Sequence, residues 1–236
     1  MVELIKDDMQ FLNYNDEKFS INFSTAFNNV DFKKSTMDGK KNIERLKELF
    51  KLDEILYLNQ IHSDKIVDCT KNSISPKGDI DGDALIINKE NIGIGVFAAD
   101  CTPVIVYDKE KRVMAAIHSG WKGTFHEITK KTCEYMIENY GCKDLKVIIG
   151  PHIGQCCYEV SVELAEKFKG KFGEDVVSKR NLSLEKCIVK QLKDIVNIQN
   201  ITFVNKCTYC NEDVKLHSFR KTGEDSGRLF AFIFMK

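Results

Sequence analysis

The chain has 236 residues, and its 35 basic side chains balance 35 acidic ones. This balance argues against a nucleic-acid binder, which needs a basic excess to neutralise phosphates. A hydrophobic content of 43% excludes a disordered or collagen-like chain. No apolar run is long enough for a signal peptide or a membrane span. We therefore expect a globular, cytoplasmic protein that binds neither nucleic acid nor membranes.

The hydrophobic pattern predicts a mixed α/β fold with layered sheets and flanking helices. Helices are expected near 40–50, from Thr124 to about residue 140, at 162–172 and at 184–196; Thr124 and Glu127 form a capping-box pattern for the second of these. Residues 76–83 are expected to form turns. Strands are expected at 55–61, 84–87, 92–98, 103–107, 113–117, 145–149, 201–205 and 229–235. No linker or repeat divides the chain, so one domain spanning residues 1–236 is the simplest organisation.

Three residues that can bind metal follow strand-like runs or end them, namely His62, Cys101 and His118. Strand ends place side chains from distant parts of a sequence in one cleft. Two imidazoles and one thiolate suit Zn²⁺ and leave its fourth position for water or substrate. Each residue taken singly is more often a packed residue than a ligand, and it is the combination that favours a metal site.

Four further residues are candidates for chemistry. Asp100 precedes Cys101, where it could bond a ligand imidazole or move a substrate proton, or simply cap a turn. Lys122, in a glycine-rich loop before a helix, could bind an anion. Arg220 and Arg228 flank a glycine-containing turn and could bind phosphate, although surface salt bridges are the commoner fate of arginine.

Nine cysteines without a secretion signal disfavour a disulfide framework. The Cys207-x-x-Cys210 pair has no second Cys-x-x-Cys partner, so we interpret it as packing. Cys156 and Cys157 are adjacent, so alternating faces would bury one thiol and expose the other. The sequence thus predicts that only Cys101 among the nine binds metal.

Six sequence blocks occur in order along the chain, namely NQIHSD (59–64), DGDAL (81–85), AADCTPV (98–104), AIHSGWKG (116–123), LKVIIGPHIGQCCYEV (145–160) and SFR with GR (218–220 and 227–228). Together these blocks resemble the YfiH-type family, which is also called the multicopper polyphenol oxidase or laccase-domain family and whose members are described as purine nucleoside phosphorylases. Lys122 stands where the family usually has arginine, and the family's Arg-x-Gly-Gly pattern is missing after residue 24.

The resemblance implies a cysteine-hydrolase-like architecture and a zinc site formed by His62, Cys101 and His118. It also implies phosphorolysis of adenosine, inosine, guanosine and methylthioadenosine, with deamination of adenosine as a second activity. A true multicopper oxidase would need roughly ten histidines for its copper centres, and this chain has five.

Two alternatives stand beside the zinc enzyme. Cys101 could be a nucleophile activated by His118, as in cysteine hydrolases. The protein could instead be a non-catalytic binding protein with a vestigial site. A zinc site uses both histidines as ligands, whereas a cysteine–histidine dyad leaves one of them without a role.

Overall fold

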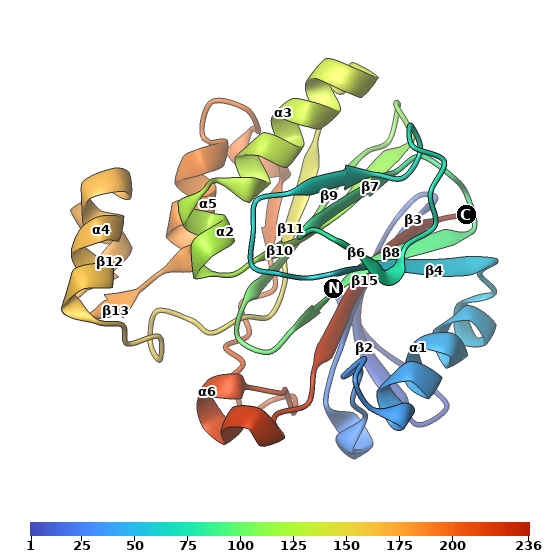
Figure 1. The fold of residues 1–236 in the computed structure, drawn as a ribbon, viewed down its shortest axis with the longest axis horizontal. Coiled ribbons are helices and arrows are strands. Elements are labelled where there is room, and N and C mark those ends of the chain that lie inside the picture. The colour runs from blue at the N-terminus through green and yellow to red at the C-terminus, as the bar shows by residue number, and fades with distance from the viewer.

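The computed structural model describes residues 1–236 and contains two large β-sheets (Figure 1). The first has seven strands in the order β1 (Val2–Lys6), β2 (Met9–Asp16), β3 (Phe19–Ser24), β15 (Leu229–Met235), β8 (Ile92–Ala98), β4 (Glu54–Asn59) and β6 (Lys77–Asp81). The second has six strands in the order β14 (Ile201–Phe203), β11 (Lys146–Ile149), β9 (Thr102–Asp108), β10 (Val113–Ser119), β7 (Ala84–Ile87) and β5 (Ile66–Asp68). Both sheets mix parallel and antiparallel pairs.

The helices are short and lie outside the two large sheets (Figure 1). They are α1 (Met37–Phe50), α2 (Trp121–Phe125), α3 (Ile128–Tyr140), α4 (Val162–Phe172), α5 (Leu184–Leu192) and α6 (Phe219–Thr222). A small hairpin of β12 (Val177–Ser178) and β13 (Asn181–Leu182) packs with α4. Single 3-10 turns occupy Phe27–Asn29, Glu174–Val176, Ile198–Asn200 and Gly223–Asp225. No helix combines the length and the apolar character that crossing a bilayer requires.

Three apolar clusters make the layers of the fold. The central cluster lies between the sheets and joins side chains such as Phe23 and Ile94 of the first sheet to Ile105 of the second. A second cluster packs α1 on the outer face of the first sheet, and a third packs α3 and α5 on the second sheet. Strands buried on both faces explain the continuous apolar runs of β8, β9, β10 and β15.

The chain crosses from the first sheet to the second at three places. The crossings run from β4 to β5, from β6 to β7 and from β8 to β9. They contain His62, then Asp83, then Asp100 with Cys101. The candidate site therefore lies where the two sheets exchange strands.

Most expected strands are confirmed, but three local expectations were wrong. Residues 77–81 form the edge strand β6 rather than turns, and Ile80 packs on the core. The expected helix from Thr124 is two helices, because the Thr124 hydroxyl pairs with Ser119 and Glu127 adopts a left-handed conformation with φ 61°. Helix α5 ends at Leu192 instead of residue 196.

Strands β1, β2 and β3 have no counterpart among the expected elements. Their apolar pattern is interrupted by polar residues that the fold buries, namely Asn13, Ser20 and Asn22. These side chains satisfy one another, since the Asn13 Nδ2 donates to the side-chain Oδ1 of Asn22 at 2.8 Å and the Asn22 Nδ2 donates to the Ser20 hydroxyl at 3.2 Å. A buried polar ladder of this kind is costly unless fully paired, which only the three-dimensional pairing shows.

Candidate metal centre and adjoining pocket

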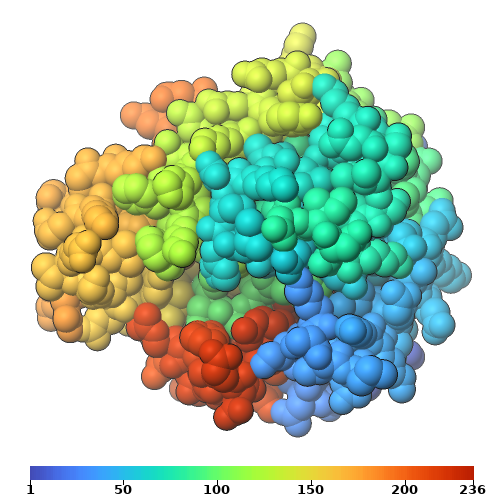
Figure 2. Space-filling view, in the orientation of Figure 1, coloured from blue at the N-terminus to red at the C-terminus, as the bar shows by residue number.

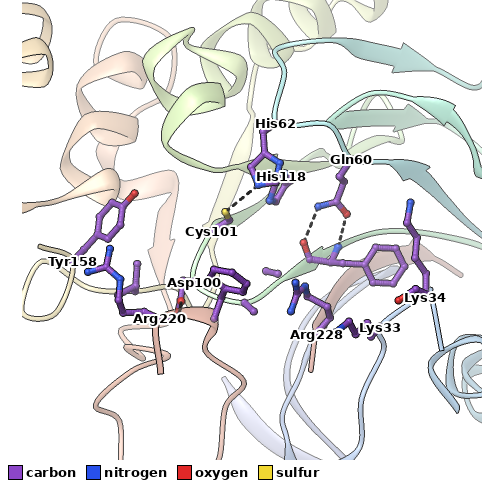
Figure 3. Close-up of a pocket in the computed structure, with 16 residues that line it drawn as sticks. Lys33, Lys34, Gln60, His62, Asp100, Cys101, His118, Tyr158, Arg220 and Arg228 are labelled. Carbon is purple, nitrogen blue, oxygen red and sulfur yellow. Dashed lines mark hydrogen bonds between the residues drawn. The ribbon is translucent and has the colours of Figure 1, made fainter. Parts of the chain in front are cut away.

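The structure brings together the three expected metal ligands, His62, Cys101 and His118 (Figure 3). His62 follows β4, Cys101 lies between β8 and β9, and His118 is the penultimate residue of β10. The Cys101 Sγ lies 3.9 Å from the His62 Nε2, and one ligand atom from each residue lies within 4.8 Å of the others. The strand ends converge as expected, although the first and last of these ligands are 56 positions apart in the sequence.

Asp83 has no exposed surface and supports this group through hydrogen bonds. Its carboxylate accepts a hydrogen bond from the His118 Nδ1 at 2.8 Å. It also accepts from the backbone N–H of His62 at 3.1 Å and from the Ser63 hydroxyl and N–H at 2.7 Å. A carboxylate bound to Nδ1 fixes the ring so that Nε2 is the free ligand atom. In the sequence Asp83 stands at the end of a turn-like segment, and this task of its carboxylate was not predicted.

Charges inside the group are strongly coupled. Burial alone would raise the pKa of the Cys101 thiol, but the charge of His118 and hydrogen bonds from both histidines lower it to about 6. Burial alone would lower the pKa of His118, but Cys101 and Asp83 raise it to about 9. Burial opposes ionisation of Asp83 too, and its hydrogen bonds from His118 and Ser63 nevertheless lower its pKa to about 2. These interactions favour a thiolate on Cys101 beside an imidazolium on His118 at neutral pH.

The backbone around the group is adapted to close approach. A Cβ at Gly120 would lie 2.9 Å from the Cys101 Sγ and 3.2 Å from the His62 Cδ2. His62 and Asp100 both have positive φ, at 59° and 88°. Left-handed conformations at non-glycine residues store strain and concentrate at functional sites. The geometry fits a bound metal ion, since two imidazole nitrogens and a low-pKa thiol converge with their supporting carboxylate in place.

Asp100 lines the same cavity but does not support a ligand imidazole. One carboxylate oxygen accepts from the Thr208 hydroxyl at 2.6 Å, and the other accepts from the Arg220 backbone N–H at 2.6 Å. We considered Asp100 as the hydrogen-bond partner of a ligand imidazole, but Asp83 has this role instead. Asp100 is thus held in place at the cavity by these two donors.

The cavity beside the ligand group has a volume of 580 Å³. Its apolar walls include Phe97, Tyr158 and Phe219, and Ile153 adds an aliphatic contact. Figure 2 shows the central green segment recessed between the blue N-terminal segment and the red C-terminal segment, which both contribute lining residues. A cavity of this size and mixed character suits a small organic substrate.

Four cations line the cavity, and only Asp100 among the lining residues is acidic. Arg220 and Arg228 are among them, as predicted from the sequence, and both are labelled among the lining side chains in Figure 3. Lys33 and Lys34 also line it, and neither was predicted from the sequence. The remaining anion candidate, Lys122, is exposed on α2 and is not part of the lining. Its ammonium lies 5.6 Å from the centre of the Trp121 ring.

Two sets of paired cysteines also meet outside this cavity. The thiols of Cys156, Cys157, Cys207 and Cys210 form a second group whose sulfur atoms lie within 4.8 Å of one another. The Cys207-x-x-Cys210 pair has no second Cys-x-x-Cys in the sequence, but it does have a partner pair in space. The partner is the adjacent pair Cys156 and Cys157, which carries no Cys-x-x-Cys spacing for the sequence to show.

The fold and the ligand group place the chain in a known family. A family model described as multi-copper polyphenol oxidoreductase laccase matches residues 20–236, and the chain belongs to that family. The chain is 45% identical over 235 residues to a purine nucleoside phosphorylase of Clostridium acetobutylicum, covering 98% of each protein. It is also 34% identical over 176 residues to a purine nucleoside phosphorylase of Aquifex aeolicus, covering 72% of this chain and 80% of that one.

Two further similarities complete the comparison. An adenosine deaminase from an unknown prokaryotic organism is 32% identical over 164 residues, which cover 65% of this chain and 62% of that protein. The crystal structure of the YfiH protein of Bacillus licheniformis superposes with a TM-score of 0.86 at 21% identity, covering 98% of this chain and 97% of that one. This last match confirms the mixed α/β, YfiH-like fold.

Proposed function

We propose that the protein is a zinc-dependent purine nucleoside phosphorylase acting on adenosine, inosine, guanosine and methylthioadenosine, and that it also deaminates adenosine to inosine. One observation carries the proposal: a single cavity of 580 Å³ is lined by His62, Cys101 and His118, by aromatic side chains and by four cations. The similarity to relatives named purine nucleoside phosphorylase and adenosine deaminase supports it.

The aromatic walls suit the base of a purine nucleoside. Phe97 and Phe219 offer flat apolar surfaces, and Tyr158 lies on the same lining. Aromatic rings bind a heterocyclic base by stacking, which tolerates different substituents on the purine. This tolerance accords with a substrate range that covers adenine-type and guanine-type bases.

The cations suit phosphate. Arg220 donates through Nη1 to the Glu159 carbonyl oxygen at 2.9 Å, and Arg228 donates through Nη1 to the Ser226 carbonyl oxygen at 2.9 Å. Each guanidinium is therefore oriented, while its other N–H groups remain for a bidentate anion. Because these cations are local, the protein needs no net positive charge to attract phosphate.

In phosphorolysis a phosphate oxygen bonds to the ribose C1′ while the bond from C1′ to the purine nitrogen breaks. The bonding electron pair leaves with the purine, which then takes up a proton. In deamination a water oxygen bonds to the purine C6 and ammonia leaves. Asp100, facing the cavity, is the group that we assign to accept the proton of the attacking phosphate or water and deliver it to the leaving group.

The three ligand residues hold the metal ion in this scheme. Zn²⁺, when bound, supplies a Lewis acid that stabilises negative charge developing on substrate. Cys101 contributes its thiolate, and Asp83 keeps His118 oriented with Nε2 free. His62 completes the set from a strained backbone position.

A second function is favoured by one observation, the low pKa of Cys101 beside the raised pKa of His118. A thiolate and imidazolium of this kind is the reactive form of a cysteine hydrolase. In that case Cys101 would attack substrate directly and no metal would be needed.

One experiment separates these functions. Purified protein, chelated and then reloaded with Zn²⁺, is incubated with adenosine with and without phosphate, and adenine, inosine and hypoxanthine are quantified. We expect adenine only when phosphate is present, inosine in both cases, loss of both products on chelation, and no product from Cys101→Ala. Full activity after chelation, with loss only on thiol alkylation, would establish the cysteine hydrolase. If zinc-loaded protein gives no product, the protein is a non-catalytic binding protein.

A further inference from the structure

Nine cysteines divide by their surroundings into three sets. Four are buried in the apolar core, namely Cys69, Cys133, Cys142 and Cys187. Cys101 belongs to the candidate metal centre. The remaining four, Cys156, Cys157, Cys207 and Cys210, form the thiol cluster outside the cavity, and none of them is fully buried. Packing in the core therefore does not account for the thiol cluster.

Two loops carry the thiol cluster and are tied together by backbone. Cys156 and Cys157 follow β11, while Cys207 and Cys210 follow β14, and these two strands pair in parallel. A bridge between His152 and Cys207 extends that pairing beyond the strand ends. The loops are thus held side by side although about 50 residues lie between them.

The spacing of the sulfur atoms matches a tetrahedral metal site. The Cys156 Sγ lies 3.6 Å from the Cys210 Sγ, and all four sulfur atoms lie within 4.8 Å of one another. A tetrahedral zinc ion with Zn–S distances of about 2.3 Å places its sulfur ligands about 3.8 Å apart. A disulfide needs about 2.05 Å between sulfur atoms, and all nine cysteines are free.

The local backbone is also adapted to a thiolate group. The Gly154 N–H donates to the Cys207 Sγ at 3.3 Å. A Cβ at Gly154 would lie 3.2 Å from the Cys156 Sγ, so a larger residue would crowd that thiol, and it would also contact the Cys207 Cβ at 3.5 Å. Backbone N–H groups that point at sulfur compensate thiolate charge.

We propose that the thiol cluster is a second metal site, a closed tetrathiolate centre for Zn²⁺ that is separate from the centre in the cavity. Four sulfur ligands leave no open position, so the site is structural and not catalytic. Cys-x-x-Cys supplies one half of the ligands and the adjacent Cys156 and Cys157 supply the other. This proposal stands whether or not the protein acts on purine nucleosides.

The second centre would stiffen one wall of the cavity. Tyr158 directly follows Cys157 and lines the cavity. Thr208, between the ligands of the other loop, donates to Asp100 at 2.6 Å. Arg220 donates to the carbonyl oxygen of Glu159. A metal ion joining the two loops would therefore fix the positions of three residues that face the substrate space.

Metal content tests the proposal directly. Elemental analysis of reduced, purified protein should give two zinc ions per chain for the wild type and about one for Cys101→Ala. The double variant Cys156→Ser/Cys210→Ser should lose one zinc and keep the other. The matched control Cys142→Ala, which alters a buried core thiol, should keep both.

Cobalt substitution identifies the ligands. Co²⁺ added to the Cys101→Ala protein should give the intense near-ultraviolet thiolate charge-transfer absorption and the visible bands of tetrahedral cobalt, and the double serine variant should give neither. Cys210→His retains a zinc ligand, so it should retain the second zinc ion and shift the cobalt bands. If the double variant fails to fold, Cys210→His and the wild type still decide the matter.

Stability gives an independent readout. Removing the second zinc ion should lower the melting temperature by roughly 5 °C or more, because the ion binds only the folded chain. The proposal is overturned if Cys101→Ala contains no zinc and binds no cobalt. It is also overturned if protein that was purified under reducing conditions, and analysed by mass spectrometry without further reduction, has the four thiols paired as disulfides.

Discussion

The substitution Gly120→Ala probes the metal centre in the cavity without touching a ligand. Gly120 has φ −71° and ψ 178°, a conformation that alanine adopts without strain. The added Cβ would lie 2.9 Å from the Cys101 Sγ, whereas ordinary contacts are 3.4–4 Å. Cys101 must therefore move by about 0.5 Å or more, the difference between those distances. His62, 3.2 Å from the same Cβ at its Cδ2, must yield as well.

A displacement of this size at two of three ligands should weaken zinc binding. Losing a single supporting contact around a metal ligand costs roughly 10-fold to 100-fold in affinity, and we expect Gly120→Ala to fall in this range. Competition with a chromogenic chelator measures the affinity, and circular dichroism checks the fold. Gly170→Ala is the matched control, because its Cβ meets no atom within 4 Å. It should bind zinc normally and gain about 0.5–1 kcal/mol of stability, since it lies within α4.

The reasoning fails if Gly120→Ala is folded and binds zinc as tightly as the Gly170→Ala control. Such a result would mean that the side chains around Gly120 are not the ligands, because no ligand set can absorb contacts this short without moving. If both variants bound zinc more weakly than the wild type, the loss of affinity would come from the protein preparation and not from the position of the substitution.

Three further predictions concern charges in the same cavity. Asp83→Asn should lower zinc affinity roughly 10-fold to 100-fold, which chelator competition would show; unchanged affinity would remove Asp83 from the centre. In chelated protein Cys101 should react with iodoacetamide at neutral pH and lose reactivity as the pH falls below about 6, because its lowered pKa keeps the thiol ionised above that value. Mass spectrometry of the alkylated protein at several pH values measures the reaction rate. A rate that rises only above pH 8 would contradict the lowered pKa. Arg220→Lys should raise the KM for phosphate several-fold by removing a bidentate fork, whereas Lys122→Ala, outside the cavity, should leave it unchanged; equal effects in phosphate titrations would refute the assignment.

The fold was predictable from the sequence where burial is uniform. Strands β8, β9, β10 and β15 are apolar along their whole length because both faces are covered. Prediction failed where tertiary contacts outweigh local pattern. The Thr124 hydroxyl satisfies Ser119 instead of capping a helix, and the edge strand β6 is polar because one side of it faces solvent.

The candidate site was predictable to the extent that it depends on strand ends. His62, Cys101 and His118 all stand at such positions, and the structure brings them together. Asp83 was missed because its task follows from a crossing between sheets, which a linear sequence does not reveal. Lys33 precedes α1 and reaches the cavity only through the packing of the N-terminal segment, and Lys34 does the same.

The surroundings of each cysteine decide what a count of nine thiols means. Burial raises the pKa of Cys69, Cys142 and Cys187 to about 12, so these thiols stay protonated and do not compete for metal. The partly exposed thiols are the ones that oxidants can reach, and a bound metal ion would shield them from oxidation. All of these partly exposed thiols gather in two groups with metal-ligand spacing. Coordination explains both their exposure and their convergence, and core packing explains neither.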